Sequence, residues 1–258
     1  MLLSGGTTFN GKTAHDYSDI EYPDDCIVDF DLRLIDLFKE LDRKSLSVKE
    51  RIKQEFYRVK ELLDGKVPSR MELFTYMDDD IYQYCIKHAK ENPFRRYMEF
   101  LNDLQELTVD EEVVYSGIGR EFLSVIETTD MQKVYKMPVL YSFYNDGDIR
   151  LAVTDEDVLV AWKKFFDNGT NWKDFSSDIS YADYKAMTDK QHLSKAKSMP
   201  IKFLKASGKG FFVEKEDYAL AIREDLKEVI GNEAFKKHMK DILEYRTMEY
   251  YRRRYVTI

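Results

Sequence analysis

Apolar residues recur at helical spacing along most of this chain. Between Val48 and Leu63 every third or fourth residue is apolar, which predicts an amphipathic helix. Ser69 and Glu72 stand three residues apart, as in a capping box, at the start of a second helix predicted over 70–89. Spacing and flanking prolines or glycines predict further helices over residues 27–43, 93–107, 121–127, 215–230 and 232–255. The chain is therefore expected to be mainly α-helical.

The segment 134–153 changes from helical to strand periodicity. Val134–Tyr144 is an apolar run of helical length, and residues 145–148 (Asn-Asp-Gly-Asp) form a turn signal. Residues 149–153 then alternate between apolar and polar, as in a half-buried strand. Thr154 is suited to cap the helix that follows it.

Residues 201–214 are predicted to form a β-hairpin. The stretches 201–206 and 211–214 flank the glycine-rich turn Ser207–Gly210. Together with the preceding elements this gives the order helix, strand, helix, helix, hairpin, which is the order of a winged helix. Because a winged helix most often holds nucleic acid, residues 134–214 indicate a DNA-handling module.

The expected fold class is mainly α with a small β component, made of a helical bundle and a winged-helix-like domain. The expected parts are an acidic linker over 1–25, a helical domain over 26–128, a winged-helix-like domain over 129–215 and a C-terminal helical pair over 216–258. Within the helical domain, residues 48–88 resemble a helix-turn-helix. An ordinary αα-hairpin is the preferred interpretation, because the aspartates at 78–80 would repel phosphates on the second helix.

Composition narrows the class of protein. Of the 258 residues, 43% are hydrophobic and 14% are aromatic, which excludes a disordered chain. No apolar run approaches the roughly 18 residues that a membrane span requires. The two cysteines, Cys26 and Cys85, lie far apart in apolar surroundings, which is typical of reduced core residues. We therefore expect a cytoplasmic protein with no membrane association.

Charge is distributed unevenly along the chain. The net charge of −8 argues against a nucleic-acid ligand, but residues 16–36 hold eight acids against one arginine and so carry most of it. Between Lys185 and Lys209, seven lysines face a single acid, Asp189. A local basic patch, and not the total charge, decides attraction to phosphate. The lysine-rich segment is therefore the candidate DNA contact.

The candidate DNA-binding residues lie on the helix near 189–198, on the hairpin after it and at the C-terminus. They are Lys190, His192, Lys195, Lys197, Lys202, Lys205, Lys209, Arg252, Arg253 and Arg254. Lysine attracts phosphate as a point charge, which gives affinity with little sequence selectivity. The alternative for the lysines is an ordinary solvated face. Phe211 or Phe212 could wedge between bases, although burial is the commoner role of hairpin aromatics.

Residues 244–255 interleave tyrosines with arginines, a composition suited to base stacking and backbone contacts. The alternative is that Tyr245, Met248, Tyr251 and Tyr255 pack against the rest of the protein at helical spacing. The arginines would then interact favourably with the C-terminal end of the helix dipole. The sequence leaves both interpretations open.

No catalytic signature is complete. Gly6–Thr13 matches the phosphate-loop pattern G-x-x-x-x-G-K-[ST], but only Met1–Leu3 precede it where a buried strand is needed. An acidic segment containing Pro23 follows, which suits neither a helix nor a bound phosphate. The four histidines do not cluster with cysteines at zinc spacing. We therefore expect no metal, no cofactor and no enzymatic activity in this chain.

Four stretches are similar to a known class of proteins. They are CIVDFDLRLIDLF (26–38), VPSRMELFTYMDDDIY (67–82), ETTDMQKVYKMPVLYSFYNDGDI (127–149) and EYRTMEYYRRRY (244–255). They resemble the region C-terminal to the motor of bacterial superfamily 2 DEAD/DEAH-box helicases of the restriction and mobile-element type. The phosphate loop, acid pair and arginine motifs of the motor are absent from the sequence. The resemblance therefore implies an accessory region of a DNA-translocating enzyme and not ATP hydrolysis by this chain, with residues 1–25 as the linker from the motor.

The expected function is a non-catalytic module that grips duplex or single-stranded DNA and orients a helicase motor on it. The expected partners are DNA and either the helicase motor domain or a partner protein of a restriction or defence complex. One alternative is a protein-interaction module that docks a nuclease or methylase through its acidic N-terminal face. The other alternative is a nuclease whose carboxylate site has no recognised motif.

Overall fold

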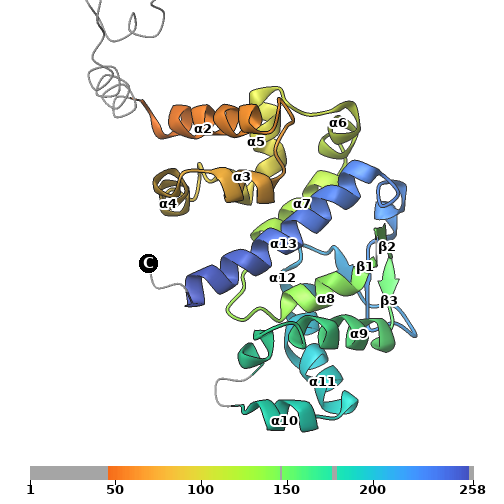
Figure 1. Ribbon diagram of the computed structural model, residues 1–258. Coiled ribbons are helices and arrows are strands. Elements are labelled where there is room, and N and C mark those ends of the chain that lie inside the picture. The colour runs from red at the N-terminus through yellow and green to blue at the C-terminus, as the bar shows by residue number, and fades with distance from the viewer. Residues whose placement is uncertain (1–45, 146, 176–178, 256–258) are drawn as a thin grey trace, which may run out of the picture.

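The computed structural model describes residues 46–145, 147–175 and 179–255. In these ranges the protein is mainly helical, with a three-stranded antiparallel sheet and a two-stranded hairpin (Figure 1). The expectation of a mainly α fold with a small β component is confirmed. The helix expected over 27–43, the phosphate-loop-like Gly6–Thr13 and Cys26 lie outside the described residues. None of the described helices has both the length and the apolarity needed to cross a membrane.

The first group of helices covers residues 48–128. Its members are α2 (Val48–Leu62), α3 (Arg70–Tyr76), α4 (Asp79–Lys87), the 3-10 helix η1 (Pro93–Arg95), α5 (Tyr97–Leu104), α6 (Val109–Tyr115) and α7 (Ile118–Thr128). The predicted capping box is confirmed, because the Ser69 hydroxyl accepts a hydrogen bond from the Glu72 amide at 3.1 Å. The single helix expected over 70–89 is wrong. Met77 is extended and the Asp78 carboxylate accepts from the Asp80 amide at 2.9 Å, which starts α4 as a separate helix.

The second group follows from residue 136 onward. Its members are α8 (Lys136–Phe143), β1 (Tyr144–Asn145), β2 (Asp148–Ile149), β3 (Ala152–Val153), α9 (Asp155–Phe166), η2 (Asn171–Asp174), α10 (Tyr181–Ala186), α11 (Asp189–Ala196), η3 (Lys197–Ile201), α12 (Lys202–Ser207), β4 (Phe212–Val213), β5 (Leu220–Ile222), η4 (Glu224–Glu228) and α13 (Glu233–Tyr255). The predicted cap is confirmed, since the Thr154 hydroxyl accepts from the Asp157 amide at 3.2 Å. The sheet order is β3-β5-β4, with Ala152 opposite Ala221 and Phe212 opposite Ile222.

The strand expected over 201–206 is wrong, because these residues continue a helix. The segments α11, η3 and α12 follow one another without a break from residue 189 to residue 207, and η3 is a π-helical turn that contains Pro200. Buried positions on this segment recur every fourth residue, at 192, 196, 200, 204 and 208. That period belongs to a helix and not to a strand. Ser207–Gly210 therefore leads from α12 into β4 and does not close a hairpin.

The helix expected over 215–230 is also wrong. Residues 220–222 form β5, the middle strand of the sheet, and residues 224–228 form the 3-10 turn η4. All three residues of β5 are buried. A strand covered on both faces does not alternate between apolar and polar, so its short apolar run has no strand signature in the sequence.

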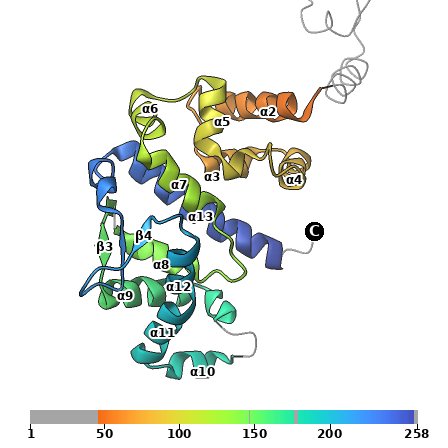
Figure 2. The same cartoon turned by 180° about the vertical axis from the view of Figure 1, so that it is seen from behind.

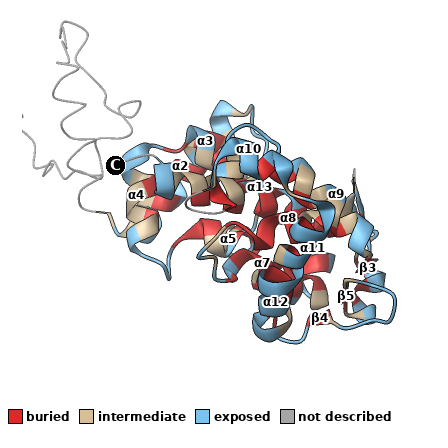
Figure 3. Ribbon diagram, turned by 90° about the horizontal axis from the view of Figure 1, so that it is seen from below, coloured by how far each residue is buried: buried red, intermediate tan, exposed pale blue. Residues whose placement is uncertain are grey.

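The long helix α13 connects two apolar cores. One core lies among α2 to α5, and the other lies among α7 to α9, α11, α12 and the sheet. Tyr245 on α13 is buried in the first core and Leu243 in the second. Figures 1 and 2 show α13 running diagonally between the two groups of helices, with α7 beside it. In Figure 3 the buried residues are concentrated on α7, α8 and α13, and α8 is buried along almost its whole length.

Gly208 lies where α12 ends and the chain turns toward β4. A Cβ at this position would lie 2.4 Å from Phe212 Cδ2 and 2.5 Å from the Leu204 carbonyl oxygen. Gly208→Ala is therefore expected to lower the free energy of unfolding by about 1–3 kcal/mol, because backbone atoms must move. Urea denaturation followed by circular dichroism measures this loss. An equal loss in Gly231→Ala, whose new Cβ would meet no described atom within 4 Å, would contradict the steric explanation.

Glu111 on α6 forms a buried contact with α13. Its carboxylate lies 2.9 Å from His238 Nε2. Burial disfavours the charged form, but the hydrogen bonds to His238 and Thr108 outweigh burial and lower the pKa of Glu111 from 4.5 to about 2. Since this pKa is lower in the folded than in the unfolded protein, the stabilisation is complete above about pH 4.5 and is lost as the pH falls toward 2.

Glu111→Gln is expected to flatten the fall in melting temperature between about pH 4.5 and pH 2, because the variant has no carboxylate to protonate there. Thermal unfolding at a series of pH values measures the slope for both proteins. Parallel curves for the variant and the wild-type protein would contradict this assignment.

Candidate nucleic-acid interface

The continuous helical segment 189–207 and the turn after it carry most of the predicted lysines. We call this exposed side of α11, η3 and α12, together with Lys209, the lysine face. Lys190, Lys202 and Lys209 are exposed, and none of them forms an ion pair with a carboxylate of the residues that the structure describes. These three ammonium groups are therefore accessible to an external phosphate.

The other three lysines of the lysine face are already in contact with neighbouring side chains. Lys197 Nζ lies 2.7 Å from an Asp155 carboxylate oxygen on α9, and Lys205 pairs with Glu214. Lys195 Nζ lies 5.6 Å from the centre of the Tyr135 ring. Exposed ion pairs of this kind contribute roughly 0–1 kcal/mol each. A phosphate could therefore replace these partners at little cost.

His192, which was predicted to contact DNA, is buried and lies outside the lysine face. Its side chain is only 3% exposed and packs against the rings of Phe175 and Tyr184, with centroid distances of 5.3 and 5.6 Å. Burial lowers the pKa of His192, which favours the neutral form of the ring. His192 is buried because it belongs to the row of the helical segment 189–207 that faces the core, whereas the lysines of the lysine face lie outside that row.

The two phenylalanines expected as candidate wedges between bases are buried, whereas a third phenylalanine, Phe203, is exposed. Phe211 and Phe212 are buried in the core and edge-on or tilted against Phe122. Phe203 on α12 is 49% exposed and follows Lys202 directly, with the exposed Met199 one turn before it. A helical assignment for residues 201–206 would have revealed Phe203 as a surface residue.

The loop between β4 and β5 is acidic. Residues 214–219 are Glu-Lys-Glu-Asp-Tyr-Ala, and residues 214–218 are exposed. Three carboxylates against one ammonium group repel phosphate, so the basic part of this region is the helical segment and not the loop between the strands. Residues 202, 205 and 209 were expected on a hairpin, but they lie on α12 and in the turn after it, because the strands begin later in the chain.

The C-terminal arginines lie at the end of α13, where Arg252 contacts α4 and the other two do not. Arg252 pairs with Asp79 at 2.8 Å and its guanidinium lies 4.5 Å from the centre of the Tyr82 ring. Arg253 pairs with Glu249 at 2.8 Å, one turn earlier on the same helix. The structure therefore does not bring the three predicted arginines into one binding surface.

The tyrosines of the same helix mostly pack against the protein. Tyr245 and Tyr250 are buried, and Tyr251 and Met248 are partly buried. Tyr255 is 54% exposed. The packing interpretation therefore holds for the tail, apart from its last described residue.

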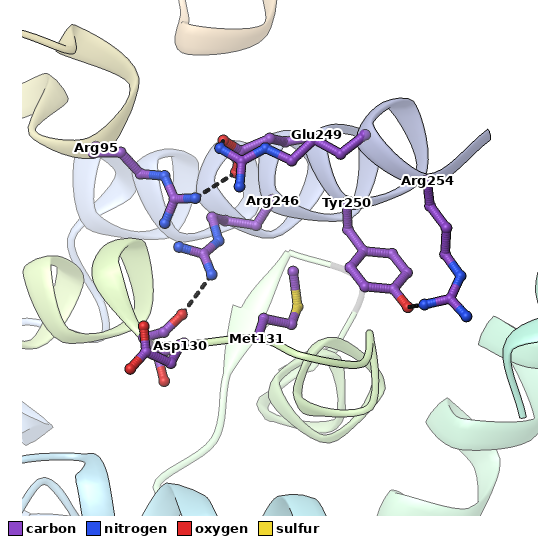
Figure 4. A pocket seen from close by; sticks show the side chains of 9 residues that line it. Arg95, Asp130, Met131, Arg246, Glu249, Tyr250 and Arg254 are labelled. Atoms are coloured by element: carbon purple, nitrogen blue, oxygen red, sulfur yellow. Dashed lines mark hydrogen bonds and ion pairs between the residues drawn. The ribbon is translucent and has the colours of Figure 1, made fainter. Parts of the chain in front are cut away.

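A basic pocket lies between α13, η1 and the loop after α7. It has a volume of about 380 Å³. Four arginines line it, namely Arg95, Arg246, Arg253 and Arg254, together with the carboxylates of Asp130 and Glu249. Figure 4 shows Arg246 pointing from α13 toward the loop that carries Asp130 and Met131, with Arg95 joined to Glu249. We call this cavity the arginine pocket.

A buried ion pair holds one wall of the arginine pocket. The Glu127 carboxylate at the end of α7 pairs with Arg70 on α3, and both side chains are almost fully buried. The Glu127 carbonyl oxygen accepts a hydrogen bond from Arg246 Nη1, and the Thr129 carbonyl oxygen accepts one from Arg246 Nη2. Burial raises the pKa of Glu127, while the charge of Arg70 opposes that rise. The position of Arg246 thus depends on the two carbonyl groups at the C-terminal end of α7.

Only part of the arginine pocket was selected from the sequence. Arg253 and Arg254 were predicted as DNA contacts, whereas Arg95 and Arg246 were not. The stretches 127–149 and 244–255 both contribute residues to this cavity, together with Arg95.

Within the described ranges, no three His, Cys, Asp or Glu side chains are grouped so that they could hold a metal ion. Comparisons with family models, with curated proteins and with solved structures found no match to this chain.

Proposed function

We propose that this chain is a non-catalytic accessory module that binds DNA through the lysine face for a DEAD/DEAH-box helicase motor. The observation that carries the proposal is the lysine face itself, with Lys190, Lys202 and Lys209 exposed on a continuous helical segment and a short turn. A helix of this kind is what helix-turn-helix proteins insert into a DNA groove.

The order of elements supports the same function. Apart from the inserted elements β1, β2, η2 and α10, the order α8, β3, α9, α11–α12, β4, β5 is that of a winged helix, and so is the strand order β3-β5-β4. In a winged helix, the helix just before the second strand enters the groove. Here that helix is α12 with α11 before it, which carries the lysines.

The chemistry of the lysine face favours non-specific binding. Lysines neutralise phosphates and release counterions, but they lack the planar fork with which arginine reads guanine. Lys190 and Lys202 lie about three helical turns apart on the same continuous segment. That separation lets one helix contact several phosphates along a strand.

Fluorescence anisotropy of labelled duplex and single-stranded DNA, titrated with the intact chain at low and high salt, tests the proposal. We expect binding at low salt that weakens steeply as salt rises, since each phosphate contact adds about 0.9 to the salt slope for duplex DNA. Absence of binding at low salt would overturn the proposal and favour the protein-docking alternative. Cleavage of the DNA in the presence of Mg²⁺ would instead support the nuclease alternative.

A further inference from the structure

We propose that the arginine pocket is a second binding site, which holds one phosphate group of a nucleic-acid strand. Its cavity of about 380 Å³ lies at the lower end of the ~300–1,000 Å³ range that is usual for small-ligand sites. Four guanidinium groups and two carboxylates line it, and a third carboxylate, that of Asp174, pairs with Arg254 at 3.2 Å, which leaves one positive charge in excess. Guanidinium groups bind phosphate with paired hydrogen bonds, so the lining matches an oxyanion.

Arg246 is the residue that most clearly lacks an anionic partner. It is 2% exposed, and no carboxylate of the described residues forms an ion pair with it. Two of its nitrogens donate to backbone carbonyl groups, and its buried Nε has no hydrogen-bond partner among the described atoms. Burial and the nearby charge of Arg95 lower the pKa of Arg246 to about 10, although the charge of the Glu249 carboxylate opposes that fall. A buried guanidinium without an ion-pair partner is costly, and a bound anion would reduce that cost.

Glu249 holds two further arginines in place around the same cavity. Its carboxylate oxygens lie 2.8 Å from Arg95 Nη2 and 2.8 Å from Arg253 Nη2. Each of these guanidinium groups has five N–H donors, and the bonds to Glu249 use only some of them. The remaining donors are available to a ligand, and Glu249 neutralises one of the two charges.

The arginine pocket is connected to the lysine face through Lys136. Lys136 Nζ donates to the Thr129 hydroxyl at 2.8 Å and to the Ser207 hydroxyl at 3.4 Å. Thr129 lines the pocket, and Ser207 is the last residue of α12. A strand lying along α12 would therefore pass close to the cavity, which makes one of its phosphates the nearest source of the ligand. The assignment to a strand rests on the proposed function, whereas phosphate binding by the pocket does not.

The first experiment measures the melting temperature of the intact chain in inorganic phosphate and in chloride at equal ionic strength. Arg95→Gln and Arg253→Gln are the test variants, because both side chains are partly exposed and their loss should leave the fold intact. Arg96→Gln is the matched control, since Arg96 neighbours Arg95 in the chain but pairs with Asp103. Ligand bound only by the folded state raises the melting temperature.

We expect phosphate to raise the melting temperature of the wild-type protein and of Arg96→Gln. In the two test variants we expect phosphate affinity to fall by about tenfold, in line with the loss of one charge-assisted hydrogen bond. If phosphate did not raise the melting temperature of the wild-type protein, or raised it equally in all four proteins, the proposal that the arginine pocket binds phosphate would be overturned. If phosphate still raises the melting temperature when Lys190, Lys202 and Lys209 are changed to glutamate, the phosphate site is distinct from the lysine face.

The second experiment identifies the source of the phosphate with oligonucleotides that carry either a 5′-phosphate or a 5′-hydroxyl. Tighter binding of the 5′-phosphate form, lost in Arg95→Gln and Arg253→Gln, would assign the pocket to a strand end. Equal weakening of both forms in the variants would assign it to an internal phosphodiester. Unchanged binding of both forms, with the inorganic phosphate effect lost, would overturn the strand assignment and leave a free phosphate or nucleotide as the ligand.

Discussion

Replacing Glu127 by alanine is expected to lower the free energy of unfolding by about 3–5 kcal/mol, which is the usual effect of breaking a buried ion pair. The Glu127 carboxylate pairs with Arg70 and accepts a hydrogen bond from the Tyr97 amide at 3.0 Å. In the variant, Asp241 would be the one carboxylate partner that Arg70 keeps among the described residues, at 3.6 Å, beside the Tyr97 ring, whose centre lies 5.1 Å from the guanidinium. The buried guanidinium would thus lose its closest counter-charge.

Urea denaturation followed by circular dichroism measures this effect. Glu244→Ala is the control, because Glu244 on α13 pairs with Lys240 at 3.7 Å and both side chains are largely exposed. We expect the control to change the stability by less than about 1 kcal/mol. If Glu127→Ala were as stable as the control, the buried pair would not hold α3 and α7 together.

Reversing the charge of the three exposed lysines is expected to have the largest effect on DNA binding. In the variant Lys190→Glu, Lys202→Glu, Lys209→Glu we expect affinity at low salt to fall on the order of a hundredfold, because attraction is replaced by repulsion. The salt slope for duplex DNA should fall by about 0.9 for each lysine that contacts a phosphate. Anisotropy titrations at several salt concentrations measure both quantities.

The matched control reverses three exposed lysines that lie outside the lysine face, as Lys53→Glu, Lys227→Glu, Lys237→Glu. Both variants have the same net charge, so a general effect of charge would weaken them equally. We expect the control to bind DNA nearly as well as the wild-type protein does. Equal losses in the two variants would show that the lysine face has no special role.

The parts of the fold that follow from local signals could be predicted from the sequence. Ser69 and Thr154 were identified as caps, and α2, α8 and α13 as helices, because each of these features depends on residues three or four positions apart. The sequence of residues 201–206 fits both a strand and a helix. The helix becomes evident only from the packing of the buried residues at 196, 200 and 204. The middle strand β5 pairs with the nearby β4 but also with β3, which lies far earlier in the chain, so local patterns alone could not reveal it.

Of the two candidate sites, the lysine face could be predicted from local sequence and most of the arginine pocket could not. Lys190, Lys202 and Lys209 were found because charge alone marks a basic segment in the sequence. The arginine pocket could not be found by that route, since Arg95 lies on η1 and Arg246 on α13. These two arginines meet only because α13 packs between the two helical groups. Charge along the sequence does not show which side of a helix a residue occupies, so it did not separate the buried His192 from the exposed lysines.

The most direct measurement of the central claim is site-specific photocrosslinking to DNA. A photoreactive amino acid is placed at residue 203, on the lysine face, and in a second protein at Leu62, a similarly exposed residue at the end of α2. The proposed function predicts salt-sensitive crosslinks to labelled DNA from position 203 and none above background from position 62. Crosslinks from position 62 alone, or equal yields from both positions, would contradict the claim that DNA lies along α11 and α12.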